Sequence, residues 1–152
     1  PYGIRFWPDF KGRDGCRTPH PWTAEAPNGG FTTGRPWLPV PAEHLALSVA
    51  RQETDPQSTL NRVRRFMAWR KETPVLFDGA IRFLDGPESC VIFVREAGNA
   101  RLLCAFNLGP AEAVVPLAEA GGTPQAEPTG FKGSWGPGGL VLPAWDAFFG
   151  WI

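Results

Sequence analysis

The chain has 152 residues, of which 43% are hydrophobic and 20% are charged, which suffices for one ordinary core or for a small domain with an appended arm. Its 15 basic and 15 acidic residues give a formal net charge of zero, so the composition argues against binding to nucleic acid or to an anionic membrane surface. No apolar run approaches the roughly 20 residues of a membrane-spanning helix. The sequence predicts a soluble chain, and because it opens on Pro1 rather than Met we expect a piece of a longer protein.

Residues 1–54 are rich in proline, glycine and tryptophan, and no periodic pattern appears before about residue 55. The recurring prolines make a regular helix or a central strand improbable over most of this region. Aromatic residues such as Trp7, Trp22 and Trp37 distinguish it from disordered segments, which are poor in them. We therefore expect a long ordered loop arm, and loops of this length are usually functional.

Within the arm, the segment KGRDGCRTPHPW (residues 11–22) is unusually rigid and charged. Pro19 and Pro21 stiffen the chain just after Arg17, because proline fixes its own φ and restricts the residue before it. A guanidinium presents a planar fork of donors that suits a carboxylate, a phosphate or a pair of sugar hydroxyls. Asp14 lies between Arg13 and Arg17, so the segment predicts either a pre-aimed arginine or an internal Arg-Asp-Arg clasp that only pins the loop.

The segment DPQSTLNRVRRFMAWRKE predicts one helix over about residues 56–72. Asp55 and Pro56 are the residues expected at an N-cap and at the first helical position, and no breaker follows before Pro74. At helical spacing, the apolar face comprises Leu60, Val63, Phe66 and Met67, with Trp69 at its edge, while Asn61, Arg64, Arg65 and Lys71 point away.

After Pro74 the pattern changes to short apolar runs separated by turn residues at about ten-residue spacing. We expect strands within 80–85, 90–96, 101–108, 112–117, 139–143 and 146–152, arranged as an antiparallel sandwich. Gly98 and Asn99 predict a hairpin between the second and third of these runs. GSWGPGGL lacks the lysine and hydroxyl residues of a phosphate loop and indicates another hairpin turn. The sequence thus predicts a mainly β chain.

No complete active site is visible in the sequence. Asp85 and Glu88 follow a predicted strand, but their Asp-Gly-Pro context is a turn signal and indicates no catalytic pair. Cys90 and Cys104 lie in apolar runs without zinc spacing, so we expect small core residues, no metal site and no cofactor. Thiols in core strands favour a reducing compartment such as the cytoplasm.

The strings PYGIRFWPDFKGRDGCRTPHPW and GGFTTGRPWLPV resemble the α-glucosidases and oligo-1,6-glucosidases of glycoside hydrolase family 13, and DPQSTLNRVRRFMAWRKETPVL is similar to the segment that follows in them. The resemblance implies that residues 1–74 end a (β/α)8 catalytic barrel, as the loop after its eighth strand and its last helix. Residues 75–152 would be the C-terminal β domain. By the same resemblance, Arg17 reaches the non-reducing glucose of an oligosaccharide or α-glucoside, and Arg13 and Asp14 belong to the turn that braces it.

The chain departs from the family pattern in two ways. His20 stands where relatives usually have methionine. The motifs of the nucleophilic aspartate, the acid/base glutamate and the stabilising aspartate do not occur, so this chain alone is expected to be inactive. Alternatives are a structural β domain or a carbohydrate-binding domain with exposed tryptophans. The pattern opposes the latter, because it predicts Trp145 and Trp151 in the core and leaves only Trp135 exposed.

Overall fold

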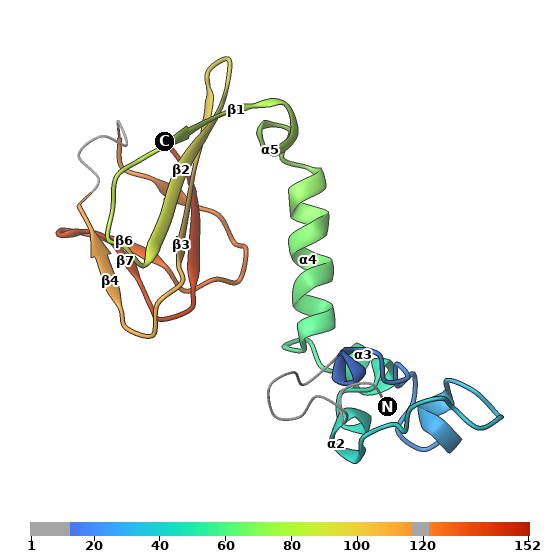
Figure 1. Ribbon diagram of the computed structural model, residues 1–152. Coiled ribbons are helices and arrows are strands. Elements are labelled where there is room, and N and C mark those ends of the chain that lie inside the picture. The colour runs from blue at the N-terminus through green and yellow to red at the C-terminus, as the bar shows by residue number, and fades with distance from the viewer. Residues whose placement is uncertain (1–12, 117–121) are drawn as a thin grey trace. The chain divides into compact units, whose positions relative to one another are not determined.

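A computed structural model describes residues 13–116 and 122–152, which form two compact units (Figure 1). The first unit is Pro1–Arg64 and the second is Arg65–Ile152, so the border falls within one helix. Residues 1–12, the first part of the string that carries the family resemblance, lie outside the described residues. The domain boundary expected between residues 74 and 75 stays a prediction. No helix among the described residues is long and apolar enough to cross a membrane.

The described part of the first unit contains more helix than the expected loop arm. Two 3-10 turns, η1 (Asp14–Cys16) and η2 (Pro27–Gly30), are followed by the short helices α2 (Ala42–Leu45) and α3 (Val49–Thr54). Each short helix begins where the preceding residue is extended, at Pro41 for α2 and at Ser48 for α3. The expectation of one helix was therefore too low. Helix α2 begins directly after Pro41, because proline permits a helix to begin beside it even where it prevents a long one, and α3 lies in the proline-free stretch that follows.

Helix α4 runs over Thr59–Lys71 and begins three residues later than expected. The Oδ1 atom of Asp55 accepts a hydrogen bond from the backbone N–H of Gln57 at 2.8 Å, so Asp55 forms a turn before the helix. The hydroxyl of Ser58 accepts one from the N–H of Asn61 at 3.2 Å, which makes Ser58 the residue that caps the helix. Two competing caps stand three positions apart in the sequence, and the second one starts the helix.

The apolar face of α4 is narrower than the sequence predicts. Phe66 and Trp69 pack against the β domain, whereas Val63 and Met67 are 53% and 42% exposed. Asn61 does not point away. Its amide donates hydrogen bonds to the carbonyls of Gln52 and Asp55, at 2.8 and 2.9 Å, and joins the start of α4 to α3. The predicted apolar face was therefore wrong at Val63 and Met67, which are exposed, and the prediction that Asn61 points away was also wrong.

The second unit is an antiparallel two-sheet sandwich, which confirms the predicted β domain. After the short helix α5 (Val75–Asp78), the described residues form eight strands, in a five-stranded sheet of order β1-β2-β3-β8-β5 and a three-stranded sheet of order β4-β7-β6. Their bounds are β1 Ala80–Phe83, β2 Cys90–Ala97, β3 Ala100–Asn107, β4 Ala113–Val115, β5 Gln125–Ala126, β6 Ser134–Gly136, β7 Gly139–Leu142 and β8 Ala147–Trp151.

Both predicted hairpins are confirmed. Strands β2 and β3 pair from Cys90 with Asn107 to Ala97 with Ala100, and Gly98 in the turn has a φ of 58°. Strands β6 and β7 form the hairpin of GSWGPGGL. There Gly139 has a φ of 115°, and a Cβ at this position would collide with the carbonyl oxygen of Val115. Glycine is therefore required at residue 139.

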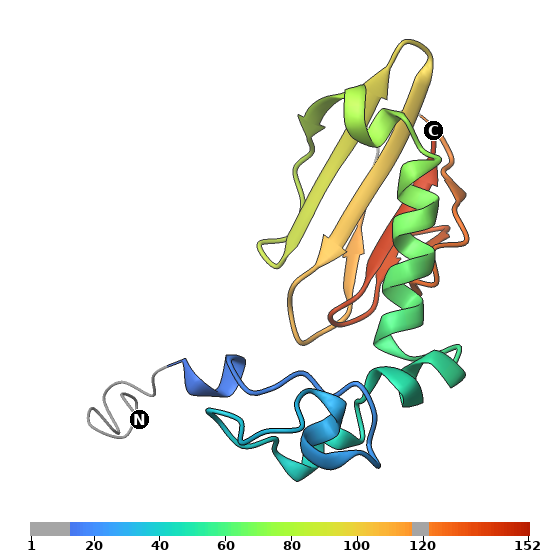
Figure 2. The same cartoon turned by 90° about the vertical axis from the view of Figure 1, so that its right-hand side faces the viewer.

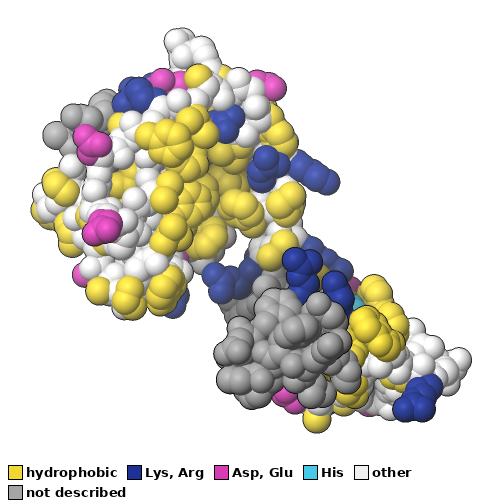
Figure 3. Space-filling model, viewed as in Figure 1, with side chains coloured by type: hydrophobic (Ala, Val, Ile, Leu, Met, Phe, Trp, Pro, Cys, Tyr) yellow, Lys and Arg dark blue, Asp and Glu magenta, His cyan; other side chains and the backbone are white. Residues whose placement is uncertain are grey.

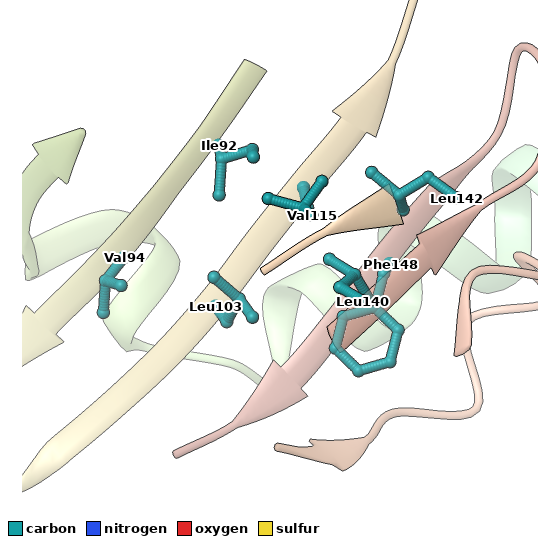
Figure 4. Packing of buried hydrophobic residues seen from close by; sticks show 8 residues of the cluster. Ile92, Val94, Leu103, Val115, Leu140, Leu142 and Phe148 are labelled. Carbon is teal, nitrogen blue, oxygen red and sulfur yellow. The ribbon is translucent and has the colours of Figure 1, made fainter. Parts of the chain in front are cut away.

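The main core lies between the two sheets (Figure 4). Alternate residues of β2, β3 and β8 meet residues of β4 and β7 in a cluster of Ile92, Val94, Leu103, Ala105, Val115, Leu140, Leu142 and Phe148. A second buried cluster lies on the outer face of the five-stranded sheet, where α4 and α5 cover β3 and β8 (Figure 2). The indole N–H of Trp69 donates to the carboxylate of Glu127 at 2.8 Å, which fixes α4 to the segment after β5.

A ladder of phenylalanine rings continues across this outer face. Ring centroids lie 5.5 Å apart between Phe149 and Phe106, 5.9 Å between Phe106 and Phe93, and 5.8 Å between Phe93 and Phe83. The helices cover only the first part, since Phe83 on β1 is 67% exposed. Figure 3 shows hydrophobic side chains gathered over these strands.

Candidate functional site

The predicted site residues Arg13, Asp14 and Arg17 lie on one tight turn. Asp14–Cys16 form the 3-10 helix η1, with Arg13 and Arg17 as its flanking residues. The N–H of Cys16 donates to the carbonyl of Arg13 at 3.2 Å, and the N–H of Arg17 donates to the carbonyl of Asp14 at 3.0 Å. Both arginines are exposed and Asp14 is half-buried. The structure therefore brings the three residues together through their backbones.

The side chains of this turn do not form a clasp. Among the described residues, neither Arg13 nor Arg17 lies within ion-pair distance of Asp14, and the ion pairs that are present involve Arg51, Arg64, Arg82 and Arg101. The thiol of Cys16 donates to the carbonyl of Arg13 at 3.1 Å. The turn is thus held by hydrogen bonds to backbone oxygens, and its arginine side chains are not used in holding it.

The segment that follows Arg17 is attached firmly to the rest of the first unit. Pro19 and Pro21 are buried, as the sequence argument for a stiff loop requires. The carbonyls of Pro21 and Trp22 each accept a hydrogen bond of 3.0 Å from the first turn of α3. The Thr18 hydroxyl lies 3.4 Å from Nδ1 of His44, and the ring of His20 meets Trp22 edge-on. Arg17 therefore projects from an anchored loop.

The second string of the arm that carries the family resemblance, GGFTTGRPWLPV, supplies most of the lining of a pocket of about 480 Å³. Asn28 has a φ of 53°, and its amide donates to the carbonyls of Thr32 and Gly34, at 3.0 Å each, which closes the loop around the pocket. The pocket is lined by Ala26, Asn28, Gly29, Arg35, Pro36, Trp37, Pro39, Val40 and Leu45. Its size falls in the range of small-molecule sites, which are typically about 300 to 1,000 Å³.

Arg17 does not line this pocket, so the sequence argument and the cavity point to different parts of the arm. Arg35 and Trp37, the polar and aromatic groups of the pocket, were given no role from the sequence. The sequence did contain a signal for these residues, since Arg35 stands two positions before Trp37 in a proline-rich loop. In the structure Trp37 is 77% exposed.

The other sequence candidates do not assemble into a reactive centre. Asp85 and Glu88 are both exposed in the β1–β2 loop. Within residues 13–116 and 122–152, no three histidine, cysteine or acidic side chains lie close enough to hold a metal ion. Cys104 is buried as expected and Cys90 is half-buried, and the three thiols are free. Burial raises the pKa of the Cys104 thiol to about 12, so this sulfur stays protonated and unreactive.

The predicted exposure of the tryptophans was wrong for two of three. Trp135 packs half-buried against the main core, since its hairpin folds onto the sandwich. Trp151 is half-buried against the second cluster, as expected. Trp145, expected in the core, is 69% exposed and has a φ of 56°. It lies in the loop before β8 and not in the strand, so the alternation of the strand does not extend to it.

Comparison with known proteins gives consistent matches. A sequence model of the alpha amylase catalytic domain matches residues 4–79. The chain is 46% identical over 149 residues to a probable alpha-glucosidase of Rhizobium meliloti (strain 1021), covering 98% of the chain and 27% of that protein. It is 34% identical over 118 residues to a probable oligo-1,6-glucosidase 2 of Bacillus subtilis (strain 168), covering 76% of the chain and 21% of that protein.

The crystal structure of an alpha-glucosyl transfer enzyme, XgtA, is similar with a TM-score of 0.87 and 45% sequence identity, over 99% of this chain and 28% of that one. These matches place the chain among the glycoside hydrolases. It belongs to the α-amylase family, glycoside hydrolase family 13. The chain spans about a quarter of the length of the relatives it matches.

Proposed function

We propose that this chain is the C-terminal portion of an α-glucosidase that hydrolyses or transfers terminal α-linked glucose of oligosaccharides. The observation that carries the proposal is the 46% identity to a probable alpha-glucosidase, which extends over 98% of the chain and so includes both units. The similarity to an alpha-glucosyl transfer enzyme supports the same reaction at the glucosidic bond, in which the glucosyl group passes to a different acceptor.

The two parts of the chain have different tasks in this proposal. Residues 1–74 end the catalytic barrel as the loop after its eighth strand and, in α4, its last helix. Residues 75–152 form a packing domain. Several large apolar side chains are about half exposed or more and need a covering surface, which supports such a division. They are Trp22, Phe31, Trp37 and Leu47 on the arm and Ile81 and Phe83 on β1. In our proposal, the remainder of the catalytic domain covers them.

Arg17 is the substrate-facing group of the arm. Arg17 is exposed, makes no ion pair with Asp14, and lies on a loop anchored by Pro19, Pro21 and the backbone of α3. A preorganised charged donor of this kind contributes roughly 1.5 to 3 kcal/mol for each hydrogen bond that it makes to a sugar hydroxyl. Arg13 and Asp14 support it through their backbone carbonyls, which accept the hydrogen bonds that hold the turn.

The bond-breaking groups lie elsewhere in the parent enzyme. Glycoside hydrolysis needs two carboxyl groups that flank the scissile bond, and Asp85 and Glu88 are exposed on a loop of the β domain. We expect the isolated chain to release no nitrophenol from nitrophenyl α-glucoside. Release that is abolished by Asp85→Asn would contradict this part of the proposal.

The experiment that tests the role of Arg17 uses the full-length enzyme that contains this chain. Loss of a hydrogen bond that strengthens in the transition state should make Arg17→Ala lower kcat/KM by tens- to hundreds-fold, for about 2 to 3 kcal/mol, at unchanged Tm. Arg13→Ala is the matched control, because it removes an equally exposed arginine from the same turn, and its effect should be smaller.

Asp14→Ala separates recognition from bracing. If Arg17 acts by contacting substrate, Asp14→Ala leaves kcat/KM closer to the wild-type value than Arg17→Ala does. If both substitutions lower kcat/KM and Tm to the same extent, the turn has only a structural role and the proposal for Arg17 fails.

A further inference from the structure

Helix α3 supports the loop that carries Arg17. The N–H of Val49 donates to the carbonyl of Pro21, and the N–H of Ala50 donates to the next carbonyl, that of Trp22, each at 3.0 Å. Figure 1 shows α3 beside the start of α4. Pro21 follows Arg17 closely in the same loop, so a displacement of α3 would move the segment that presents this arginine.

Both ends of the side-chain amide of Gln52, a residue of α3, form hydrogen bonds within the first unit. Nε2 of Gln52 donates to the carbonyl of Leu47 at 2.6 Å and so holds the segment that leads into α3. Oε1 accepts from the N–H of Leu60 at 3.1 Å, and this N–H is one of those that have no partner within the first turn of α4. One side chain thus joins α3 both to the segment before it and to the helix after it.

The backbone carbonyl of Gln52 is a second meeting point of α3 and α4. It accepts hydrogen bonds from the hydroxyl of Ser58 at 2.7 Å and from the amide of Asn61 at 2.8 Å. The same Asn61 amide lies 3.2 Å from the carbonyl oxygen of Glu53 and 2.9 Å from that of Asp55. The C-terminal end of α3 is therefore held against the start of α4 by polar side chains.

Apolar packing contributes little to the position of α3. None of the residues Val49–Thr54 is buried, and neither of the two buried hydrophobic clusters of the described chain includes a residue of the arm. Hydrogen bonds are directional, whereas the hydrophobic effect is not, so the bonds at Gln52 fix where α3 lies as well as holding it. Removing them should shift α3 without opening a cavity.

We propose that Gln52 is a positioning residue for the proposed reaction, which fixes α3 on α4 and thereby sets the place of Arg17. Gln52 acts through the loop anchored at Pro21 and Trp22 and contacts no substrate itself. A misplacement of about 1 Å can lower a rate about a hundredfold even when the altered residue lies far from the chemistry. The inference rests on the proposed role of Arg17 and adds the residue that aims its guanidinium.

A purely structural role for Gln52 predicts a different result. If Gln52 only stabilised the fold, its loss would lower the amount of folded enzyme, and the effect on kcat/KM would multiply with that of Arg17→Ala. If Gln52 acts through Arg17, its effect on kcat/KM should disappear once the guanidinium has been removed, because residues that act through one contact are not additive.

The test is a double-mutant cycle of Gln52→Met and Arg17→Ala in the full-length enzyme that contains this chain. Methionine has a similar length and lacks both groups of the amide. We expect Gln52→Met to lower kcat/KM by about ten- to a hundredfold alone, and by less than about threefold when Arg17→Ala is also present. Gln57→Met is the control, because Gln57 is an exposed glutamine between α3 and α4, and it should stay within about twofold of wild type.

A second variant separates folding from positioning. Gln52→Glu keeps an acceptor for the N–H of Leu60, which caps α4, and loses the donor to the carbonyl of Leu47. Its Tm should therefore stay within about a few degrees of the wild-type value. Its kcat/KM should still fall, and the fall should again disappear in the Arg17→Ala background.

Three results would overturn the inference: effects of the Gln52 and Arg17 substitutions that multiply, a wild-type kcat/KM in Gln52→Met, or a failure of both Gln52 variants to fold. In each of these cases a lowered kcat/KM of Arg17→Ala would still support the proposed function, so the two are judged separately. A wild-type kcat/KM in Arg17→Ala itself would overturn both.

Discussion

The two units of this chain are ordered by different forces. The second unit buries continuous apolar surface on both faces of its five-stranded sheet. In the described part of the first unit, Leu38 is the one large aliphatic or aromatic side chain that is fully buried, and the backbone is held instead by hydrogen bonds from amides such as Asn28 and Asn61. A segment fixed in this way keeps its charged side chains exposed. In our proposal, this difference is the reason that the arm, whose charged side chains stay exposed, contacts substrate.

The largest expected effect is on the reactivity of the Cys104 thiol, which should differ between the native and the unfolded chain. Burial raises its thiol pKa from 9.0 to about 12, which lowers the thiolate fraction at pH 8 by about a thousandfold. The exposed Cys16 should therefore react with a thiol reagent at once, and Cys104 only after denaturant is added. Counting modified cysteines by mass spectrometry with time checks this. Rapid modification of Cys104 in the native chain would show that the second cluster is open.

The next largest effect is on the free energy of unfolding, which a cavity should lower by different amounts in the two units. Leu103 is fully buried between the sheets, so Leu103→Ala should lower the free energy of unfolding by about 3 kcal/mol. Leu38→Ala in the arm should cost less, about 2 kcal/mol, because Leu38 belongs to neither of the two buried hydrophobic clusters. Urea unfolding of both variants measures the contrast. Equal costs would mean that the arm has an apolar core comparable with that of the sandwich.

Asn107 is a residue of the sandwich that, like the arm, depends on hydrogen bonds between a side-chain amide and the backbone. The two hydrogens of its buried amide are shared among three carbonyl oxygens, and its oxygen accepts a hydrogen bond from the N–H of Gly109 at 2.9 Å. Asn107→Leu should therefore cost about 2 to 3 kcal/mol, since buried carbonyls lose their partners. Asn99→Ala in the exposed β2–β3 turn is the control and should be nearly neutral. A small effect at residue 107 would show that water replaces the amide.

Most of the strands and two of the hairpins were predictable from the sequence, whereas the order of the strands and the short helices of the arm were not. Alternation and glycine turns act over a few residues, so the β2–β3 hairpin and the β6–β7 hairpin follow directly from their strings. Helix α4 could begin after either of two possible N-cap residues, Asp55 or Ser58. The hydrogen bonds that Ser58 and Asn61 donate to the carbonyl of Gln52 favour the start after Ser58. The exposure of Trp145 depends on Asn107, far away in sequence, so local pattern could not indicate it.

The smallest effect is expected at Glu96, where β1 meets the β2–β3 hairpin. A hydrogen bond from Arg82 at 3.1 Å, with a further one from Arg101 at 3.3 Å, holds the pKa of Glu96 below its ordinary value of 4.5. Because the folded-state pKa is lowered, the stabilisation is present above about pH 4.5 and is lost as the pH falls through the lowered pKa. Glu96 is one third exposed, so salt weakens the effect.

Glu96→Gln checks this pH dependence. The Tm of the variant should be slightly below that of the wild type at pH 7, and the difference should shrink as the pH falls below 4.5 and through the lowered pKa of Glu96. A difference that is constant over this range would assign the effect to packing and not to charge.

The central claim is that the arm recognises sugar through the guanidinium fork of Arg17, and Arg17→Lys in the full-length enzyme tests it most directly. Lysine keeps the positive charge and loses the planar pair of donors. We therefore predict that kcat/KM of Arg17→Lys stays within a few-fold of the Arg17→Ala value, about tens-fold or more below wild type, at unchanged Tm. A near-normal kcat/KM in Arg17→Lys at wild-type stability would contradict the claim.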